Sequence, residues 1–305
     1  MKCILLGYPR SGTSWLRSVL DAHPALRLVN EPLNGDANER AGEGGLFTAI
    51  RRHLGQETLT RYAAITKACS RQWRGIPAAA LSADQQRDLQ WAIHAFFQAT
   101  KATGFKEVWS GLKVPLLWEA TRSTDKDTRV LYLVRGFYGV LYSVHRRGFW
   151  FWSHRLHHNL YKHYTALSPD CQRIAAAFRD WTTREARTIV TWLTWNYHDI
   201  QAVEAIPDGH IVRYEDLVQY RDIAVDKVLG FLGLDMTPEV ETALQITGQD
   251  ATDAPYDSRK DAMRLLEETQ NVARAYRDLI VETRRRVEGL RSEISRPDLL
   301  DWLMP

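Results

Sequence analysis

The sequence lacks the features that define several large classes of protein. It has only three cysteines, Cys3, Cys69 and Cys171, which lie far apart and without the spacing of metal ligands. This pattern argues against a disulfide framework and favours reduced thiols in a reducing compartment. No apolar stretch approaches the roughly 20 residues that a membrane span requires, and the apolar run 3–6 is too short for a secretory signal. We therefore expect a cytoplasmic protein with no membrane span.

The sequence also lacks a strong excess of charge of either sign. Its 40 Lys and Arg residues against 37 Asp and Glu give a net charge of +3, which provides no general attraction for nucleic acid. With 45% apolar and 25% charged residues, the composition excludes a disordered or fibrous protein. No linker or internal repeat divides the chain, so residues 1–305 are expected to form one domain.

Strand and helix patterns alternate along the chain. Short apolar runs bounded by turn residues predict strands at 3–6, 26–29, 110–114, 130–134 and 211–214. Helical periodicity is found between them, over 15–20, 46–72, 84–101, 180–205 and 222–233. The alternation favours an α/β fold with a mainly parallel sheet flanked by helices. A long charged C-terminal helix is expected over 259–295, and its apolar stripe packs on the core or, alternatively, forms a homodimer contact.

The most informative segment is the turn after the first predicted strand. Gly7 and Gly12 frame a G-x-x-x-x-G turn that leads into a helix, so backbone N–H groups and the positive helix end surround one point. This arrangement is an anion cradle, although glycines can also serve a turn for geometry alone. Thr13 occupies the position of the lysine that a P-loop NTPase requires, and the cation is instead Arg10 inside the turn. The turn therefore favours a bound phosphate or sulfate without the chemistry of a nucleoside triphosphate.

Residues 9–16 resemble the 5′-phosphosulfate loop of sulfotransferases that use 3′-phosphoadenosine 5′-phosphosulfate (PAPS). Family members have Lys or Arg at the position of Arg10, followed by Ser-Gly-Thr or Ser-Gly-Ser. The resemblance implies a P-loop-like three-layer fold, with PAPS as the sulfuryl donor and adenosine 3′,5′-bisphosphate (PAP) as its product. The residues that it assigns to the cofactor in this loop are Pro9, Arg10, Ser11, Gly12, Thr13, Ser14 and Trp15.

A second anion site is indicated at the end of the predicted strand 130–134. Arg135 follows this strand and Ser143 lies eight residues later, which resembles the family's 3′-phosphate motif. The pair Gly136-Phe137 replaces the Asp-Pro or Asn-Pro that usually follows the arginine. The resemblance implies that Arg135 and Ser143 bind the 3′-phosphate.

Two further segments fit the same family. Residues 213–217 resemble its Arg-Tyr-Glu-Asp-Leu segment, which implies that Tyr214 lies by the adenine and that the acidic pair is structural. Arg259 and Lys260 resemble the basic segment that closes on the 3′-phosphate, or alternatively they begin a solvated helix. In total the resemblance covers about residues 1–31, 108–146 and 209–217.

Sulfuryl transfer requires positive charge at the transferring and leaving oxygens. Arg10 is placed to contact the 5′-phosphosulfate. Lys113, at the end of the predicted strand 110–114, resembles the family's conserved lysine and is assigned to the sulfuryl group or the leaving oxygen. The alternative for Lys113 is a solvated surface lysine. Because these two residues supply the charge, no metal is required.

The transfer also requires a base for the acceptor's proton. Cytosolic small-molecule sulfotransferases have a histidine two residues after the conserved lysine, where this chain has Pro115. Asn30-Glu31-Pro32 resembles the Glu-Pro of carbohydrate-type relatives, so Glu31 is the predicted base, in an exposed loop after a strand. There, Arg10 and Lys113 would hold its pKa down. The alternative role for Glu31 is a salt bridge that orders residues 34–45.

Histidines offer other candidates for the base and mark the centre of the chain. His145, close in sequence to Ser143, is a better candidate than His23. Residues 128–169 hold no acidic residue, but they hold five histidines and the aromatic run 149–152. They predict an acceptor-binding lid or, alternatively, an aromatic core segment with a solvated basic face. The cluster at 154–158 has no carboxylate or cysteine nearby, so no metal site is expected there.

The sequence leaves the acceptor open between a small molecule, a glycan and a lipid. Two other functions also stay open. One is a P-loop kinase or NTPase, which the missing lysine disfavours. The other is a module that binds PAP or another polyanion without catalysis.

Overall fold

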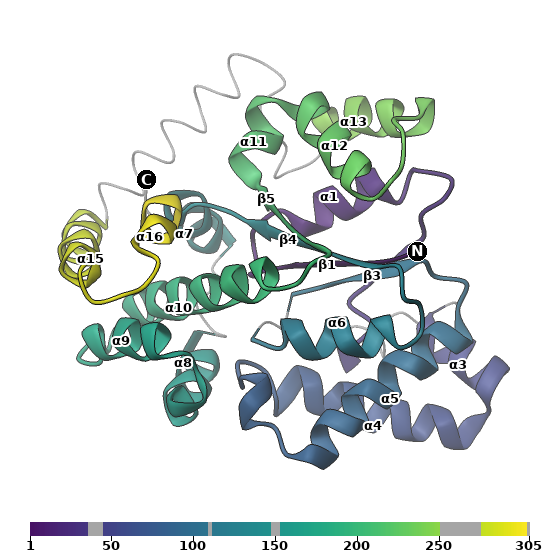
Figure 1. Ribbon diagram of the computed structural model, residues 1–305, viewed down its shortest axis with the longest axis horizontal. Coiled ribbons are helices and arrows are strands. Elements are labelled where there is room, and N and C mark those ends of the chain that lie inside the picture. Colours follow the sequence, from purple (N-terminus) through teal and green to yellow (C-terminus); the bar gives the residue numbers. More distant parts are fainter. Residues whose placement is uncertain (36–44, 109–111, 148–152, 251–275, 304–305) are drawn as a thin grey trace.

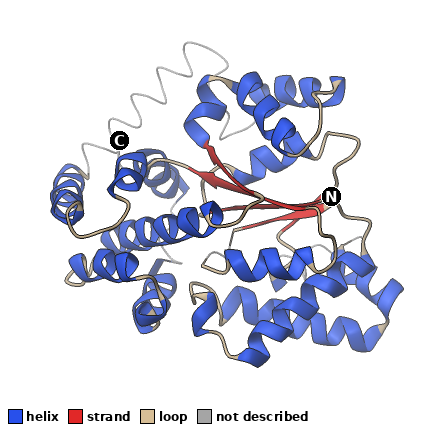
Figure 2. Ribbon diagram, in the orientation of Figure 1, coloured by secondary structure: helices blue, strands red, loops and turns tan. Residues whose placement is uncertain are grey.

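The computed structural model describes residues 1–35, 45–108, 112–147, 153–250 and 276–303. Its centre is a five-stranded sheet in the order β2-β3-β1-β4-β5, and every pair of neighbouring strands is parallel. The strands are β1 Lys2–Gly7, β2 Leu28–Asn30, β3 Gly104–Glu107, β4 Thr128–Val134 and β5 Gly209–Arg213. The expected α/β fold with a parallel central sheet is thus confirmed (Figure 2).

β1 and β4 are mostly apolar because helices cover both faces of the sheet. In β1, Cys3 and Leu5 pack into one apolar cluster, whereas Ile4 and Leu6 pack into the other. This alternation follows from the twofold period of a strand. The two faces of the sheet are therefore covered by two separate apolar cores, and β1 lies between these cores.

Figure 1 shows helices on both faces of the sheet and a further group beyond the ends of its strands. On one face lie α1 Thr13–Leu20, α11 Tyr214–Gln219, α12 Arg221–Phe231 and α13 Pro238–Asp250. On the other lie α6 Val114–Arg122, α3 Leu46–Leu54, α4 Gln56–Arg71, α5 Ala83–Ala99 and α10 Arg184–Glu204. Toward the carboxyl ends of the strands lie α7 Phe137–Arg147, α8 Ser153–Lys162, α9 Pro169–Ala177, α15 Arg277–Leu290 and α16 Pro297–Leu303.

The strand order places a topological switch point at the carboxyl end of β1. The chain leaves β1 for the edge strand β2, returns to β3, and then crosses β1 to reach β4. Because the connections diverge on the two sides of β1, loops there separate and leave room for a ligand. The loop that follows β1 lies at this position.

Three expectations about local structure were wrong. The third strand is β3 at Gly104–Glu107, and the apolar stretch 112–117 instead leads into α6, with Pro115 in its first turn. Apolar residues here serve a buried helix, and proline suits the first turn because its missing N–H has no partner there anyway. The helix expected over 46–72 is interrupted at Gly55, whose φ of 88° is left-handed.

The third expectation concerned the C-terminal helix. Residues 259–275 lie outside the described part of the chain. In the described part, α15 ends at Leu290 and a turn precedes α16, whose first residue is Pro297. Proline removes a backbone donor and favours the start of a new helix, so the helix does not reach residue 295.

The three cysteines are buried and free, as expected for reduced thiols. Of the helices that the structure describes, none combines enough length with enough apolar character to cross a bilayer.

Candidate functional site

The loop after β1 is held in an unusual backbone conformation. Arg10 has a φ of 76° and Gly12 a φ of 95°, both left-handed, with Ser11 between them. The backbone N–H and the hydroxyl of Ser11 both donate to the Tyr8 carbonyl, at 3.1 and 2.5 Å. A left-handed non-glycine residue is strained, and such strain is concentrated at ligand sites. The loop is therefore closed by its own hydrogen bonds around the start of α1.

The amino end of α1 is left open toward this loop. Gly12 is its N-cap and has no side chain with which to bond the N–H groups of the first turn. That turn holds Thr13, Ser14 and Trp15 and no acidic residue, so the positive end of the helix is not neutralised locally. Ser14 is exposed, whereas Thr13 is buried. The start of α1 can therefore accept an anion.

Arg135, at the end of β4, joins the second predicted anion site to this loop. Its Nη1 donates to the Arg10 carbonyl at 3.2 Å. Its guanidinium lies 4.2 Å from the centre of the Tyr214 ring. A Cβ on Gly12 would lie 2.6 Å from that same ring, so only glycine permits the close packing of Tyr214. The predicted loop, Arg135 and Tyr214 are therefore one packed group.

Ser143 on α7 completes the contact between the two predicted sites. Its hydroxyl accepts a hydrogen bond from Nε of Arg10 at 2.9 Å. Gly139, one turn earlier on α7, leaves the space for Arg135, because a Cβ there would lie 2.5 Å from Nε of Arg135. At the start of α7, the Gly136 N–H donates to Oε1 of Glu215 at 2.9 Å, which gives that carboxylate the expected structural role.

Glu31 lies at the same edge of the sheet, two strands away from β1. Its N–H donates to the Lys106 carbonyl, its Oε1 lies 2.6 Å from Nζ of Lys106, and its Oε2 accepts from Nδ2 of Asn34 at 2.7 Å. Its side chain is 14% exposed, so the expectation of an exposed loop carboxylate was wrong. The contact with Lys106 arises because Asn30 on β2 pairs with Lys106 on β3. The two side chains therefore leave adjacent strands together.

The groups that lower the pKa of Glu31 are not the ones that were expected to do so. Burial raises the pKa of Glu31, but the charge and hydrogen bond of Lys106, the hydrogen bond of Asn34 and the charge of Arg74 together hold it below its usual value. Arg10 and Lys113 were expected to have this effect, and neither is the cause. Glu31 is thus an ionised carboxylate at neutral pH, and each engaged oxygen keeps a further lone pair.

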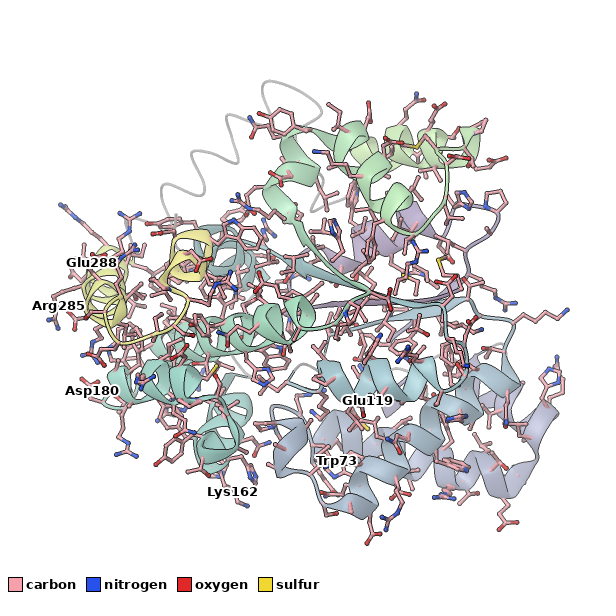
Figure 3. All side chains as sticks on the ribbon, viewed as in Figure 1. Trp73, Glu119, Lys162, Asp180, Arg285 and Glu288 are labelled. Carbon is pink, nitrogen blue, oxygen red and sulfur yellow. The ribbon has the colours of Figure 1, made fainter. Side chains whose placement is uncertain are left out.

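Lys113 is buried. It was expected either to end a strand at the sulfuryl group or to be a solvated surface lysine, and neither expectation included burial. It is the N-cap of α6, not the end of a strand, and only 2% of its surface is exposed. Its Nζ donates to the Trp73 carbonyl at 2.9 Å, in the helical layer where Figure 3 labels Trp73. Burial lowers the pKa of Lys113 to about 8, although the neighbouring Cys69, Asp199 and Glu107 act in the opposite direction.

The two histidine candidates occupy different surroundings. His145 is exposed on α7, and its Nδ1 lies 3.0 Å from the hydroxyl of Tyr276. His23 follows the other end of α1, where its Nδ1 accepts the Ala25 N–H at 3.1 Å. Because the amino end of α1 faces the loop, His23 is a helix length away from it. Of the two, His145 shares a helix with Ser143.

Some predicted site residues lie outside the described part of the chain. They are Arg259, Lys260 and the aromatic run 149–152. In the described part of the central segment, the ring of His157 packs against Tyr161 at 4.5 Å between centres. Among the described residues, no group of three or more histidine, cysteine, aspartate or glutamate side chains is placed to hold a metal ion.

Sequence reasoning did not single out Lys106, Gly139 or Asp199. Lys106 follows Gly104 and Phe105 in β3. Its one signal in the sequence is a charged residue inside a short strand pattern. Gly139 lies within a helical pattern, and such a glycine usually marks close packing. Asp199 is fully buried on α10, where a lone acidic residue gives no signal at all.

The structure thus combines a five-stranded parallel sheet, a loop after its central strand β1 that is closed by its own hydrogen bonds, and a basic residue, Arg135, at the end of the neighbouring strand β4. The chain belongs to the sulfotransferase family, whose sequence profile matches residues 3–238. It is therefore a transferase. Among proteins with curated functions, none matches the chain.

Three of the solved structures that match the chain are similar to it over most of its length. The sulfotransferase domain of the Synechococcus PCC 7002 olefin synthase is 18% identical, with a TM-score of 0.47 over 90% of this chain and 94% of that one. The sulfotransferase domain of the curacin biosynthetic pathway is 17% identical, with a TM-score of 0.44 over 90% and 96%. Sulfotransferase STF9 of Mycobacterium avium is 13% identical, with a TM-score of 0.43 over 91% and 76%.

Proposed function

We propose that the protein transfers a sulfuryl group from PAPS to a hydroxyl or amine of a small-molecule, glycan or lipid acceptor. The observation that supports this most is the contact between the two anion motifs. Arg10 of the first motif bonds Ser143 of the second, and Arg135 bonds the Arg10 carbonyl. A donor with phosphates at both 5′ and 3′ positions needs two cationic sites within one nucleotide's length. A nucleoside triphosphate carries no 3′-phosphate, so it does not need the second cationic site.

The first turn of α1 and the loop are assigned to the 5′ end of the donor. The N–H groups of Thr13 and Ser14, with the hydroxyl of Ser14, are donors suited to a phosphosulfate. Arg10 adds a charged donor to the same loop. Because hydrogen bonds from charged groups are roughly twice as strong as neutral ones, Arg10 is the main source of affinity there.

Arg135 and Ser143 are assigned to the 3′-phosphate, and Tyr214 to the adenine side. The guanidinium of Arg135 is fixed between the Tyr214 ring and the backbone of Arg10, which leaves it preorganised for a phosphate. These donors fit a bisphosphate nucleotide in number and charge. When bound, PAPS supplies an activated sulfuryl group whose leaving group is PAP.

For the transfer itself, we assign Glu31 as the base and Lys113 as the cation for the leaving oxygen. The lowered pKa of Glu31 keeps it ionised, and Lys106 and Asn34 fix its direction. A carboxylate so held can accept the acceptor's proton at neutral pH. His145 is the second candidate for the base, since it lies on the helix of Ser143 and its exposed ring is open to an acceptor.

The test uses the purified chain with labelled PAPS and a panel of phenols, sugars, lipids and peptides. Transfer of a sulfuryl group, detected as a mass increase of the acceptor with release of PAP, supports the proposal. Binding of PAP with no turnover on any acceptor would indicate a binding module instead. Hydrolysis of ATP in the same assay would indicate an NTPase.

A further inference from the structure

Leu112, which directly precedes Lys113, has a strained backbone. Its φ of 66° is left-handed, although leucine is not among the residues that tolerate this region. Leu112 is fully buried, so no solvent contact explains the conformation. A strained residue persists only where its surroundings over-determine it, and such residues gather at functional sites. The question is therefore what holds Leu112.

Two distant parts of the chain fix its backbone. The Leu112 N–H donates to Oδ1 of Asp199 on α10 at 2.8 Å. The Leu112 carbonyl accepts the Ala78 N–H at 2.9 Å, at the start of a short 3-10 helix, Ala78–Ala80. The backbone N–H and the carbonyl of Leu112 are thus both hydrogen-bonded to residues that are far away in the sequence.

Asp199 is the charged member of this arrangement. It is 0% exposed, and its Oδ1 also lies 3.0 Å from Nδ1 of His198. An ionised carboxylate in such a place is costly unless charges and hydrogen bonds offset its desolvation. The Leu112 N–H and Nδ1 of His198 offset part of that cost at Oδ1, and the positive charge of Lys113 acts in the same direction, whereas Oδ2 has no hydrogen-bond partner among the described residues.

We propose that Asp199 is a positioning residue for Lys113, which it holds through the backbone of Leu112 and through its own negative charge. The proposal rests on the proposed function, because it gives Lys113 a task in sulfuryl transfer. Asp199 itself does not touch the substrate. Its role is to set the direction of the first turn of α6 and to keep the buried lysine charged.

The neighbours of Asp199 on α10 support the same reading. Trp195, one turn earlier, packs edge-to-face on Tyr8 of the loop at 5.4 Å between ring centres. Asn196 accepts a hydrogen bond from the hydroxyl of Tyr132 on β4 at 3.0 Å. One buried face of α10 therefore contacts the loop after β1, the strand that leads to Arg135 and the turn before Lys113.

The titratable groups that face Lys113 come from three elements. They are Cys69 on α4, Glu107 at the end of β3 and Asp199 on α10. Burial lowers the pKa of Lys113 to about 8, and the carboxylate of Asp199 raises it. Removing that charge must lower the pKa further, so a larger fraction of Lys113 becomes neutral near pH 7.

The first experiment needs no activity, so it stays valid if the proposed function fails. Lysine carrying ¹³C at Cε is incorporated, and the Lys113 signal is assigned with Lys113→Met. In the unaltered protein, Lys113 should titrate near pH 8, and the Leu112 amide should exchange as slowly as core amides. In Asp199→Asn, which keeps the size and an oxygen for Leu112, the titration should move to lower pH. In Asp199→Ala, the Leu112 amide should exchange about 10- to 100-fold faster.

The second experiment measures transfer from PAPS. Asp199→Asn should lower kcat by about 10- to 100-fold near pH 8 and less at lower pH, with the KM for PAPS within about threefold. The matched control is Asp170→Asn on α9, which removes another buried carboxylate, bonded to Ser295 and Tyr197. Asp170→Asn should change neither kcat nor the Lys113 titration.

Three results would overturn the proposal. One is a Lys113 titration near the ordinary lysine value of about 10.4 in the unaltered protein, and another is fast exchange of the Leu112 amide there. Neither result depends on the folding of an Asp199 variant. The third is an Asp199→Asn protein whose Lys113 titration and kcat equal those of Asp170→Asn. If no acceptor is ever sulfated, the spectroscopic result still decides whether Asp199 positions Lys113.

Discussion

Arg10 donates a hydrogen bond from Nε to the hydroxyl of Ser143 at 2.9 Å, although 133 positions separate them in sequence. The contact joins the loop after β1 to the helix after β4. It exists because these two strands are neighbours and parallel, so the segments that follow them meet at one edge. The two predicted anion motifs therefore lie in contact at the carboxyl ends of β1 and β4.

Arg135→Ala should weaken PAP binding far more than 5′-AMP binding. Only PAP carries the 3′-phosphate, and loss of a charge-assisted hydrogen bond costs about 1.5–3 kcal/mol, which is roughly a 10- to 150-fold loss. The measurement is calorimetric titration of both nucleotides at fixed salt concentration. An equal loss for PAP and 5′-AMP would show that Arg135 does not contact the 3′-phosphate.

Gly139→Ala should reduce PAP affinity without unfolding the protein. Alanine favours the helix by up to about 1 kcal/mol, but its Cβ would lie 2.5 Å from Nε of Arg135 and must displace that side chain. We expect an affinity loss of about tenfold with an unchanged or raised melting temperature. The control is Gly230→Ala on α12, where a Cβ would meet nothing within 4 Å. If both variants bind PAP alike, Gly139 is not needed to seat Arg135.

Glu31→Gln should lower turnover by about 10²–10⁴-fold, the usual contribution of a positioned base. Glutamine keeps the shape and the contact with Asn34 but cannot take the proton. PAPS affinity should stay near that of the unaltered protein, as judged by nucleotide titration. The comparison is His145→Ala. Full turnover in Glu31→Gln together with loss of turnover in His145→Ala would assign the base to the histidine.

Lys106→Met should move the acidic limb of the rate–pH profile upward. The ammonium of Lys106 is the main influence that holds the pKa of Glu31 down, and burial acts in the opposite direction. Without Lys106, the pKa of Glu31 should rise, so the carboxyl group becomes protonated at a higher pH than in the unaltered protein. Turnover of this variant should then fall at a higher pH than turnover of the unaltered protein. An unshifted acidic limb would mean that ionisation of Glu31 does not govern the rate.

The same pair affects stability. A carboxyl whose folded pKa is lowered stabilises the fold above its unfolded pKa and loses that contribution as pH falls through the folded value. The melting temperature of the unaltered protein should therefore fall below about pH 4.5, and Lys106→Met should show a smaller fall over that range. The measurement is thermal unfolding at a series of pH values. An identical pH dependence in both proteins would contradict an ion pair between Lys106 and Glu31.

The sequence sufficed to predict the central sheet where local pattern and burial agree. β1 and β4 are built around continuous apolar runs, since both of their faces are covered, and the predicted ranges 3–6 and 130–134 lie inside them, although each strand extends beyond its apolar run. β3 was missed because Lys106 and Glu107 are charged and yet buried, at 2% and 1% exposure. Local pattern cannot reveal a charge that a partner from another strand stabilises.

The same limit governs the site. The meeting of Arg10 with Ser143 was foreseeable, because both motifs follow strands and strand ends meet at one edge. The partner of Glu31 was not, because it depends on which residue of β3 lies beside Asn30. Lys113 was misplaced for the same reason: whether a lysine is solvated or buried against Trp73 depends on the turn after α4, and Trp73 precedes Lys113 by 40 residues in the chain.

The sheet ends on short strands at both sides. β2 has three residues and β5 has five, whereas β4, in the interior, has seven. A three-residue edge offers few free backbone groups for pairing with a second sheet, which is a common protection against uncontrolled association. The β2 edge is therefore poorly suited to pairing with a second copy of this chain, and a variant that lengthens β2 should be more prone to aggregate than the unaltered protein.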